Sequence, residues 1–138
     1  MKTYSFAFVV RGDEILMLRQ RMDFRAFFSL PGGEVKEDED PKETAKRELY
    51  EICDIKAECI KLLTVNHKLS EVTEYVYLFE DDKGSEPKKM KDSTFEDQSI
   101  LNVQFVKFDL LSERDKAYLY SCGILEVPGF REKLFQKL

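Results

Sequence analysis

Residues 33–55 have the sequence GEVKEDEDPKETAKRELYEICDI, a glycine turn followed by an amphipathic segment. Asp40, Pro41 and Glu43 are typical of a helix start. An aspartate at this point can accept hydrogen bonds from free backbone N–H groups, proline fits the first helical position, and a glutamate two residues later can reach back toward the cap. The segment therefore predicts a helix that runs to about Cys53.

The predicted helix has an apolar side and an acidic side. Ala45, Leu49 and Ile52 share one stripe, because side chains three or four residues apart lie on one face of a helix. Glu48 and Glu51 lie one turn apart on a neighbouring stripe. A carboxylate pair of this kind is most often a solvated helix face, so it points to chemistry only together with the residues around it.

A carboxylate pair beside a glycine turn suits a divalent cation. Mg²⁺ prefers oxygen ligands and takes one or two carboxylates together with substrate phosphates. A bound ion can neutralise charge on phosphate oxygens and make a water nucleophilic, which are the two requirements of pyrophosphate hydrolysis. Gly32 and Gly33 lack side chains, so the backbone can approach the ion or the phosphate closely. The chemistry of this segment is compatible with a diphosphate and with Mg²⁺ or Mn²⁺, but taken alone the glycines would be a turn and the carboxylates a solvated helix face, so the residues around them decide.

The spacing of these residues resembles the Nudix box of the MutT-like Nudix hydrolase family. In order, the box is glycine, five residues, glutamate, seven residues, arginine, glutamate, an aliphatic residue, one residue, two glutamates, one residue, glycine and an aliphatic residue. The chain matches it at Gly33, Glu39, Arg47, Glu48, Leu49, Glu51 and Ile55. The resemblance implies an α/β fold, the Nudix-type α/β/α sandwich with a mixed sheet. It also implies divalent-cation-dependent hydrolysis of the pyrophosphate bond in a nucleoside diphosphate linked to another group.

The resemblance assigns chemical roles to part of the box. Glu48 and Glu51 are expected to be catalytic and to bind the metal, with Glu48 acting as a ligand or as the base. The Gly32 carbonyl is a further expected metal ligand. In the acidic loop that follows, Glu96 or Asp97 is expected to add another ligand.

The rest of the box is expected to be structural. It consists of Gly33, Glu39 and Arg47, and an ion pair between Glu39 and Arg47 would hold the loop against the helix. Alone, the glycines would be a turn, and the ion pair would be a surface contact that contributes little. The joint spacing of all these residues favours the functional interpretation.

Two positions depart from the family pattern. Ile52 stands where the family has the second glutamate of its pair, usually a principal metal ligand, and Asp54 stands where the family has glycine. An isoleucine cannot bind a cation, so weak activity is expected. The alternative is a catalytically weak or inactive Nudix-fold module that binds a nucleotide or another partner. A purely structural interaction domain is a third hypothesis.

The composition indicates one globular domain over residues 1–138, since hydrophobic residues make up 43% of the chain and charged residues 36%. The formal net charge of -5 argues against extended nucleic acid and an anionic membrane as partners, so a nucleotide-like small molecule is the expected substrate. No leader or long apolar run is evident, which favours a cytoplasmic location. The exposed strand pattern leaves a homodimer open.

Outside the box, alternation and turn residues predict the remaining elements. We expect strands at residues 4–10, 15–18, 55–66, 72–80 and 103–108, helices at 113–121 and 128–134, and loops at 21–29 and 81–97. The only histidine, His67, falls in a predicted turn at 67–70 and is expected at the surface. Without a Cys-x-x-Cys spacing, reduced and mostly buried thiols are expected at Cys53, Cys59 and Cys122.

Overall fold

The structure, a computed structural model, describes residues 1–69, 71–81, 83–93, 98–130 and 132. Its strands are β1 (Lys2–Arg11), β2 (Glu14–Met22), β3 (Arg25–Ser29), β4 (Gly32–Glu34), β5 (Cys59–Lys68), β6 (Val72–Glu80) and β7 (Gln98–Lys107). Its helices are α1 (Pro41–Cys53) and α2 (Glu113–Ser121), with short 3-10 helices η1 (Phe108–Leu110) and η2 (Ile124–Glu126). Of the predicted helix at 128–134, residues 131, 133 and 134 lie outside the described part of the chain.

The strands form one mixed sheet. Its main path has the order β3-β2-β1-β6-β5, with β4 paired to β1 and β7 paired to β2. β1 and β6 run parallel, with Phe6 opposite Val76, and the other pairs are antiparallel. Parallel neighbours require a long connection between them, and here that connection contains α1.

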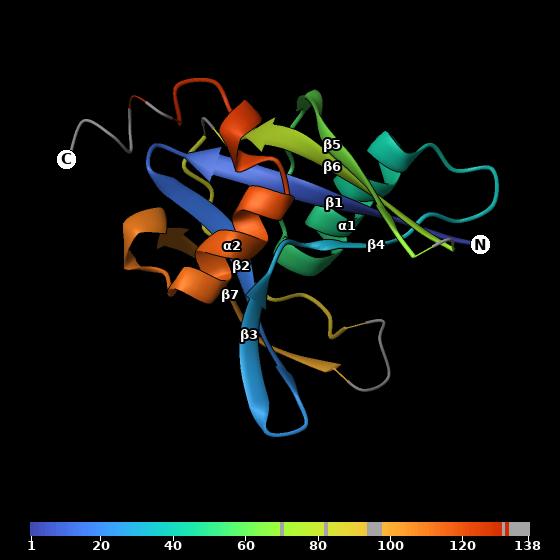
Figure 1. The fold of residues 1–138 in the computed structure, drawn as a ribbon. Coiled ribbons are helices and arrows are strands. Elements are labelled where there is room, and N and C mark those ends of the chain that lie inside the picture. Colours follow the sequence, from blue (N-terminus) through green and yellow to red (C-terminus); the bar gives the residue numbers. More distant parts are fainter. Residues whose placement is uncertain (70, 82, 94–97, 131, 133–138) are drawn as a thin grey trace.

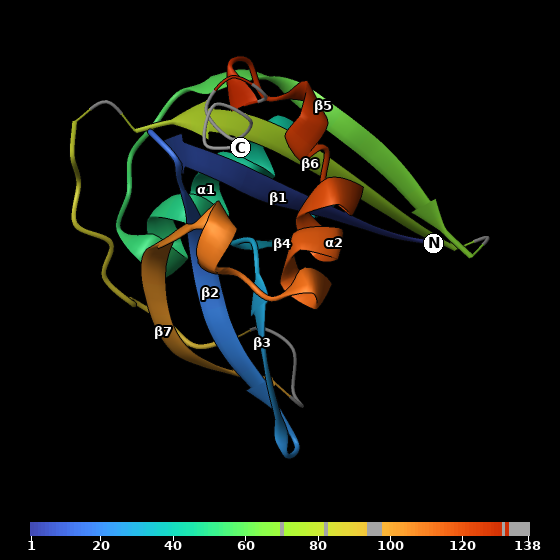
Figure 2. The same ribbon diagram turned by 60° about the vertical axis from the view of Figure 1, so that its left-hand side comes forward.

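Helices cover both faces of this sheet (Figure 1). Successive side chains of a strand point to opposite faces, so β1 contributes to two cores. Val9 packs in one buried cluster with Leu49 of α1, whereas Phe8 packs in a second buried cluster with Leu119 of α2. Figure 2 shows the two helices on opposite sides of β1 from another direction. The predicted α/β/α sandwich with a mixed sheet is confirmed.

The predicted helix over residues 41–53 is confirmed as α1, and its two ends follow from its sequence. Asp40 Oδ1 accepts a hydrogen bond from the Lys42 N–H at 2.8 Å. At the other end Asp54 has a left-handed φ of 58°, and its N–H donates to the Tyr50 carbonyl at 2.9 Å. This conformation favours glycine, but aspartate adopts it more readily than most residues. The departure at Asp54 therefore keeps the helix end that the box glycine would make.

The prediction of a loop over residues 21–29 was wrong. β2 continues to Met22, and Arg25–Ser29 forms β3, which pairs with β2 in a hairpin. This hairpin projects from the sandwich (Figures 1 and 2). β3 is an edge strand with no fully buried residue, so no alternation of apolar and polar residues marks it in the sequence.

Other predictions outside the box had mixed outcomes. The predicted turn at 67–70 starts too early, because β5 runs to Lys68 and includes His67, which is exposed as expected. The described residues of the predicted loop at 81–97 contain no helix or strand before Gln98. Cys53, Cys59 and Cys122 are all free. In the described part of the chain, no helix combines the length and apolar character needed to cross a bilayer.

Candidate active site

The glycine turn predicted at Gly32 and Gly33 differs from the structure, in which both residues belong to the short strand β4, paired with β1 and packed against α1. In β4, Gly33 pairs opposite Ser5 of β1. A Cβ atom added at Gly33 would lie 2.7 Å from Glu48 Oε1, and one added at Gly32 would overlap the Ser5 carbonyl and Phe6. Real Cβ atoms do not approach other atoms so closely, so Gly32 requires glycine, and a side chain at Gly33 would displace the Glu48 carboxylate. The turn thereby brings the Glu48 carboxylate directly beside the backbone.

Glu39 and Arg47 form a two-point ion pair at the start of α1. Arg47 Nε donates to Glu39 Oε2 at 2.8 Å, and Arg47 Nη2 donates to Glu39 Oε1 at 3.1 Å. Glu39 also accepts hydrogen bonds from Thr44 Oγ1 at 2.6 Å and from the Lys36 N–H at 3.2 Å. The hydrogen bonds from Arg47 lower the pKa of Glu39 to about 2. The loop before α1 is thus tied to the helix by a charged side chain that stays ionised.

Arg47 also brings the two glutamates of the helix together. Its Nη1 donates to Glu48 Oε1 at 3.0 Å and to Glu51 Oε2 at 3.1 Å. Glu48 is only 3% exposed, whereas the Glu51 side chain is 41% exposed. A buried carboxylate is costly unless it is paired, so the ion pair with Arg47 offsets the cost of burying the Glu48 side chain beside Gly33.

A lysine that the sequence did not single out completes this cluster. Lys91 Nζ lies 2.9 Å from Glu51 Oε2, to which it donates, and 3.2 Å from Glu48 Oε2. The second contact is an ion pair without hydrogen-bond alignment. The hydrogen bond from Lys91 lowers the pKa of Glu51. Burial lowers the pKa of Lys91, but the contacts with Glu51 and Glu48 more than offset this, and its pKa is raised.

Backbone hydrogen bonds hold Lys91 in this place. The Lys88 N–H donates to the Cys53 carbonyl at 3.0 Å, and the Met90 N–H donates to the Ile52 carbonyl at 2.8 Å. The last carbonyls of a helix lack partners within the helix, so this loop satisfies two groups that α1 leaves open. The segment just before Lys91 is thereby fastened to the end of the helix that carries the two glutamates.

The donor atoms fit one divalent cation. Glu48 Oε2 is buried but accepts no hydrogen bond within the described residues, as expected of an oxygen kept for an ion. Glu51 provides a second carboxylate. Ile52 is 3% exposed and packs in the core, so it provides none, and Glu96 and Asp97 lie outside the described residues. Across the described ranges no three His, Cys, Asp or Glu side chains converge, so substrate oxygens would have to complete the coordination.

A cleft of about 290 Å³ opens beside the turn, and both Gly32 and Ile52 line it. Its other walls include Gln20 of β2, Phe27 of β3 and Tyr118 of α2. Gln20 is 6% exposed, and its Nε2 donates to Ser29 Oγ at 2.5 Å. Its Oε1 accepts no hydrogen bond from any described residue. An amide oxygen that accepts no hydrogen bond in a cleft is available to a ligand.

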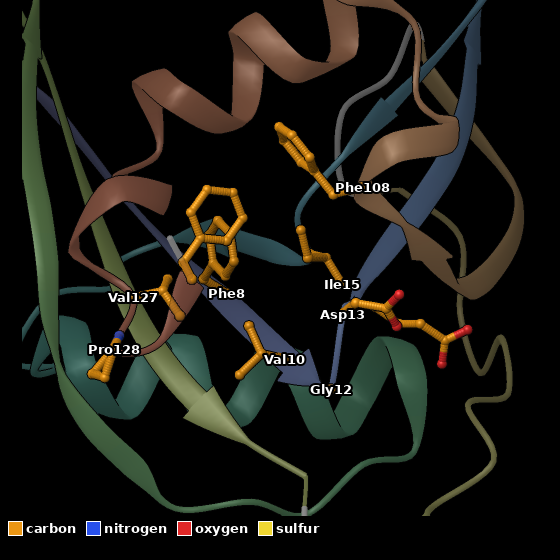
Figure 3. A pocket seen from close by; sticks show the side chains of 10 residues that line it. Phe8, Val10, Gly12, Asp13, Ile15, Phe108, Val127 and Pro128 are labelled. Atoms are coloured by element: carbon orange, nitrogen blue, oxygen red, sulfur yellow. The ribbon is translucent and has the colours of Figure 1, made fainter. Parts of the chain in front are cut away.

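A second, apolar pocket lies on the face of β1 that carries Phe8 (Figure 3). Phe8, Val10, Ile15, Val127 and Pro128 contribute to its lining. Its volume is about 20 Å³, roughly the room for a single water molecule. None of the predicted site residues lines it. This pocket is a packing gap next to residues 127–130 and is too small for a nucleotide.

Three residues of the site, Lys91, Gln20 and Tyr118, were missed at the level of sequence. Lys91 belongs to a lysine-rich loop, KKMK at residues 88–91, in which nothing distinguishes one lysine from another. Gln20 and Tyr118 come from elements that are distant along the chain and meet only after the sheet and α2 have packed. No local signal could have identified them.

Comparisons with known proteins agree with this fold. A family model described as NUDIX domain matches residues 1–121. A MutT NUDIX hydrolase from Burkholderia pseudomallei is 23% identical, with a TM-score of 0.65 over 86% of this chain and 95% of that one. An ADP-ribose pyrophosphatase from Streptococcus suis is 20% identical, with a TM-score of 0.61 over 80% of this chain and 76% of that one.

A third solved structure, a UDP-X diphosphatase, is 20% identical, with a TM-score of 0.61 over 88% of this chain and 62% of that one. Curated protein sequences gave no match. At these identities the solved structures show the shared fold, and the family model covers most of the chain. The chain belongs to the NUDIX domain family.

Proposed function

We propose that the protein hydrolyses the pyrophosphate bond in a nucleoside diphosphate linked to another group, with the help of a divalent cation. The observation that carries this proposal is that Glu48 and Glu51 share the Arg47 guanidinium group and that Glu48 lies beside Gly33, whose neighbour Gly32 lines a cleft. The two glycines leave room for a diphosphate, the carboxylates suit a cation, and the cleft beside Gly32 has room for an organic group.

Each part of the site has a distinct role in this proposal. Glu48 and Glu51 would hold Mg²⁺ or Mn²⁺, with the Gly32 carbonyl and Glu96 as further ligands. When bound, the ion would neutralise charge on the phosphate oxygens and supply an activated water. Glu48, buried and fixed by Arg47, is placed to keep an oxygen at a constant position as a ligand or as the base. Glu51, more exposed, can adjust to the substrate.

The cleft gives the reason for proposing a nucleoside diphosphate derivative. Phe27 and Tyr118 can flank a planar base, and the unpartnered amide oxygen of Gln20 can accept a hydrogen bond from it. Burial raises the pKa of Tyr118 well above its usual range, so the hydroxyl stays protonated. The names of two structural relatives, an ADP-ribose pyrophosphatase and a UDP-X diphosphatase, support this class of substrate.

Turnover assays test the proposal. A panel of nucleotides, dinucleoside polyphosphates and nucleotide sugars, with ADP-ribose included, would be incubated with Mg²⁺ or Mn²⁺ and the products resolved. We expect slow hydrolysis of at least one nucleoside diphosphate derivative, lowered by about 100-fold in Glu48→Gln. Glu43→Gln, at an exposed glutamate of the same helix, should match the wild type. Absence of product from every compound would contradict the proposal.

A second candidate function is nucleotide binding without cleavage, and Ile52 favours it. Ile52 occupies the box position of a glutamate and lines the cleft, so the cation has one carboxylate fewer. Ile52→Glu would restore that ligand. Ile52→Gln is the control, because glutamine has the shape of glutamate without its charge. A gain of orders of magnitude in Ile52→Glu alone, over a nearly inert wild type, would identify a binding module. Little change would mean that Glu48 and Glu51 suffice.

A further inference from the structure

The cluster around Glu48 and Glu51 already contains a cation that belongs to the chain. Lys91 Nζ lies 2.9 Å from Glu51 Oε2 and 3.2 Å from Glu48 Oε2. These two oxygens are the atoms that an ion shared by the carboxylates would bind. An ammonium group and a divalent ion cannot occupy that point together, because both are positive and both need the same oxygens.

The ammonium group is held there by the fold. The N–H groups of Lys88 and Met90 donate to the carbonyls of Cys53 and Ile52, which fastens the backbone immediately before Lys91 to the end of α1. By contrast, the side chains of Lys88 and Lys89, in the same loop, make no ion pair with a described residue. The contact is therefore specific to one lysine of this lysine-rich segment.

Arg47 cannot play the same part. Its Nε and Nη2 are both committed to Glu39, and only Nη1 reaches Glu48 and Glu51. Removing the guanidinium would break four hydrogen bonds, whereas Lys91 donates one hydrogen bond and can swing away on its flexible stem. Of these two cations, the lysine is the one that an entering ion can displace.

We infer that Lys91 competes with the divalent cation: its ammonium group holds the place between Glu48 and Glu51, and an ion binds there only after the ammonium group has left. This inference rests on the cation dependence proposed above, but it concerns the affinity for the ion and not hydrolysis. It identifies a residue outside the box that sets how much Mg²⁺ or Mn²⁺ the protein requires. Lys91 and the missing carboxylate at Ile52 would both raise the cation concentration at which the site is filled.

Mn²⁺ binding, followed by the electron paramagnetic resonance signal of the free ion, tests the inference without any substrate. Lys91→Met removes the charge but keeps an unbranched apolar stem, and it should bind Mn²⁺ about tenfold or more tightly than the wild type. Lys91→Arg, which retains a cation, should stay close to the wild type. Lys89→Met, with the same change of charge in the same loop, is the matched control and should leave the affinity unchanged within about twofold.

Glu48→Gln in the Lys91→Met background should remove the gain in affinity, which places the ion at this carboxylate. Equal affinities of the wild type and Lys91→Met would overturn the inference. An equal gain in Lys89→Met would overturn it too, because the effect would then be a general one of charge. A gain that survives Glu48→Gln would show that the ion binds elsewhere. If Lys91→Met bound no Mn²⁺, the ammonium group would not be what prevents the ion from binding, and the inference would be overturned.

A measurement on the wild-type protein covers the case in which Lys91→Met does not fold. The Nζ group of Lys91, labelled with ¹⁵N, should give an ammonium resonance while it is held by Glu48 and Glu51, and this resonance should shift or broaden as Mg²⁺ is added. A resonance unchanged at saturating Mg²⁺ would overturn the inference. Neither readout involves turnover. If the protein hydrolysed no compound of the panel, the proposed function would be contradicted, but the competition between Lys91 and the cation would still be tested by the Mn²⁺ affinities.

Discussion

Arg47 determines the geometry of the site at the scale of single residues. Its guanidinium group donates to Glu39, Glu48 and Glu51, so one planar cation orients three carboxylates. A lysine could not do this, because its ammonium group is a point charge without the rigid fork of donors. The box positions of Arg47 and Glu39 are therefore explained by the orientation that they give to the two glutamates.

Glu39→Gln should abolish part of the acid dependence of stability. Hydrogen bonds from Arg47 lower the pKa of Glu39 from 4.5 to about 2. Between these values the unfolded chain binds more protons than the native state, so Glu39 stabilises the fold above about pH 4.5 and this contribution is lost as the pH falls toward 2. At neutral pH the variant should lose about 1 to 3 kcal/mol of unfolding free energy. Urea denaturation from pH 2 to pH 7 measures the difference.

The control for this experiment is Glu43→Gln, which removes an exposed glutamate from the first turn of the same helix. Its loss of stability should be small and nearly independent of pH. A difference between wild type and Glu39→Gln that is the same at pH 2 and at pH 7 would mean that Arg47 does not lower the pKa of Glu39.

The sequence predicted part of the site at this scale. Gly33, Glu39, Arg47, Glu48 and Glu51 follow from spacing within one short segment, and the structure brings all of them together. Lys91 could not be predicted, because its position depends on two backbone hydrogen bonds to the far end of α1. The roles of the glutamates as metal ligands stay predictions.

At the scale of elements, α1 carries the site because both of its ends are well defined. Asp40 caps the start, Pro41 fixes the first residue, and the left-handed Asp54 ends the helix. The loop over residues 83–93 then adds hydrogen bonds to the last carbonyls. A helix fixed at both ends holds Glu48 in a constant position beside Gly33.

Asp54→Gly should stabilise the protein. Asp54 has a φ of 58°, a conformation that costs an L residue energy and costs glycine almost none. Restoring the box glycine should raise the unfolding free energy by about 0.5 to 1 kcal/mol, whereas Asp54→Ala should lower it by a similar amount. Chemical denaturation of the three proteins compares them directly. If both variants were equally stable, the backbone conformation at residue 54 would not be what favours glycine there.

Elements with local signals were predicted well and those without were not. α1 and α2 have capping residues at their starts, Asp40 and Ser112, which sequence analysis can use. β3 has no such signal, because an edge strand with partly exposed faces lacks an apolar period and is defined by its pairing with β2. For the same reason, the wall of the cleft that β3 forms was predicted as a loop.

At the scale of the whole molecule, the sandwich places groups from both layers around one cleft. α1, on one face of the sheet, supplies Ile52 and holds the glutamates, while α2, on the other face, supplies Tyr118 (Figure 2). Tyr118 also accepts a hydrogen bond from the Leu30 N–H at 2.9 Å, which fastens the glycine turn to α2. The fold could be predicted from the box because the box specifies the glycine segment and the helix against which the sheet packs.

The most direct test of the account is a crystal structure of the protein with Mn²⁺ and a non-hydrolysable nucleoside diphosphate derivative, with the ion located by its anomalous scattering. We predict an ion bound by Glu48 and Glu51 and contacting the diphosphate, the Lys91 ammonium group moved away, and the base in the cleft beside Gln20. An ion and ligand bound elsewhere, or a ligand in the cleft with Lys91 still between the two glutamates and no ion there, would contradict the account.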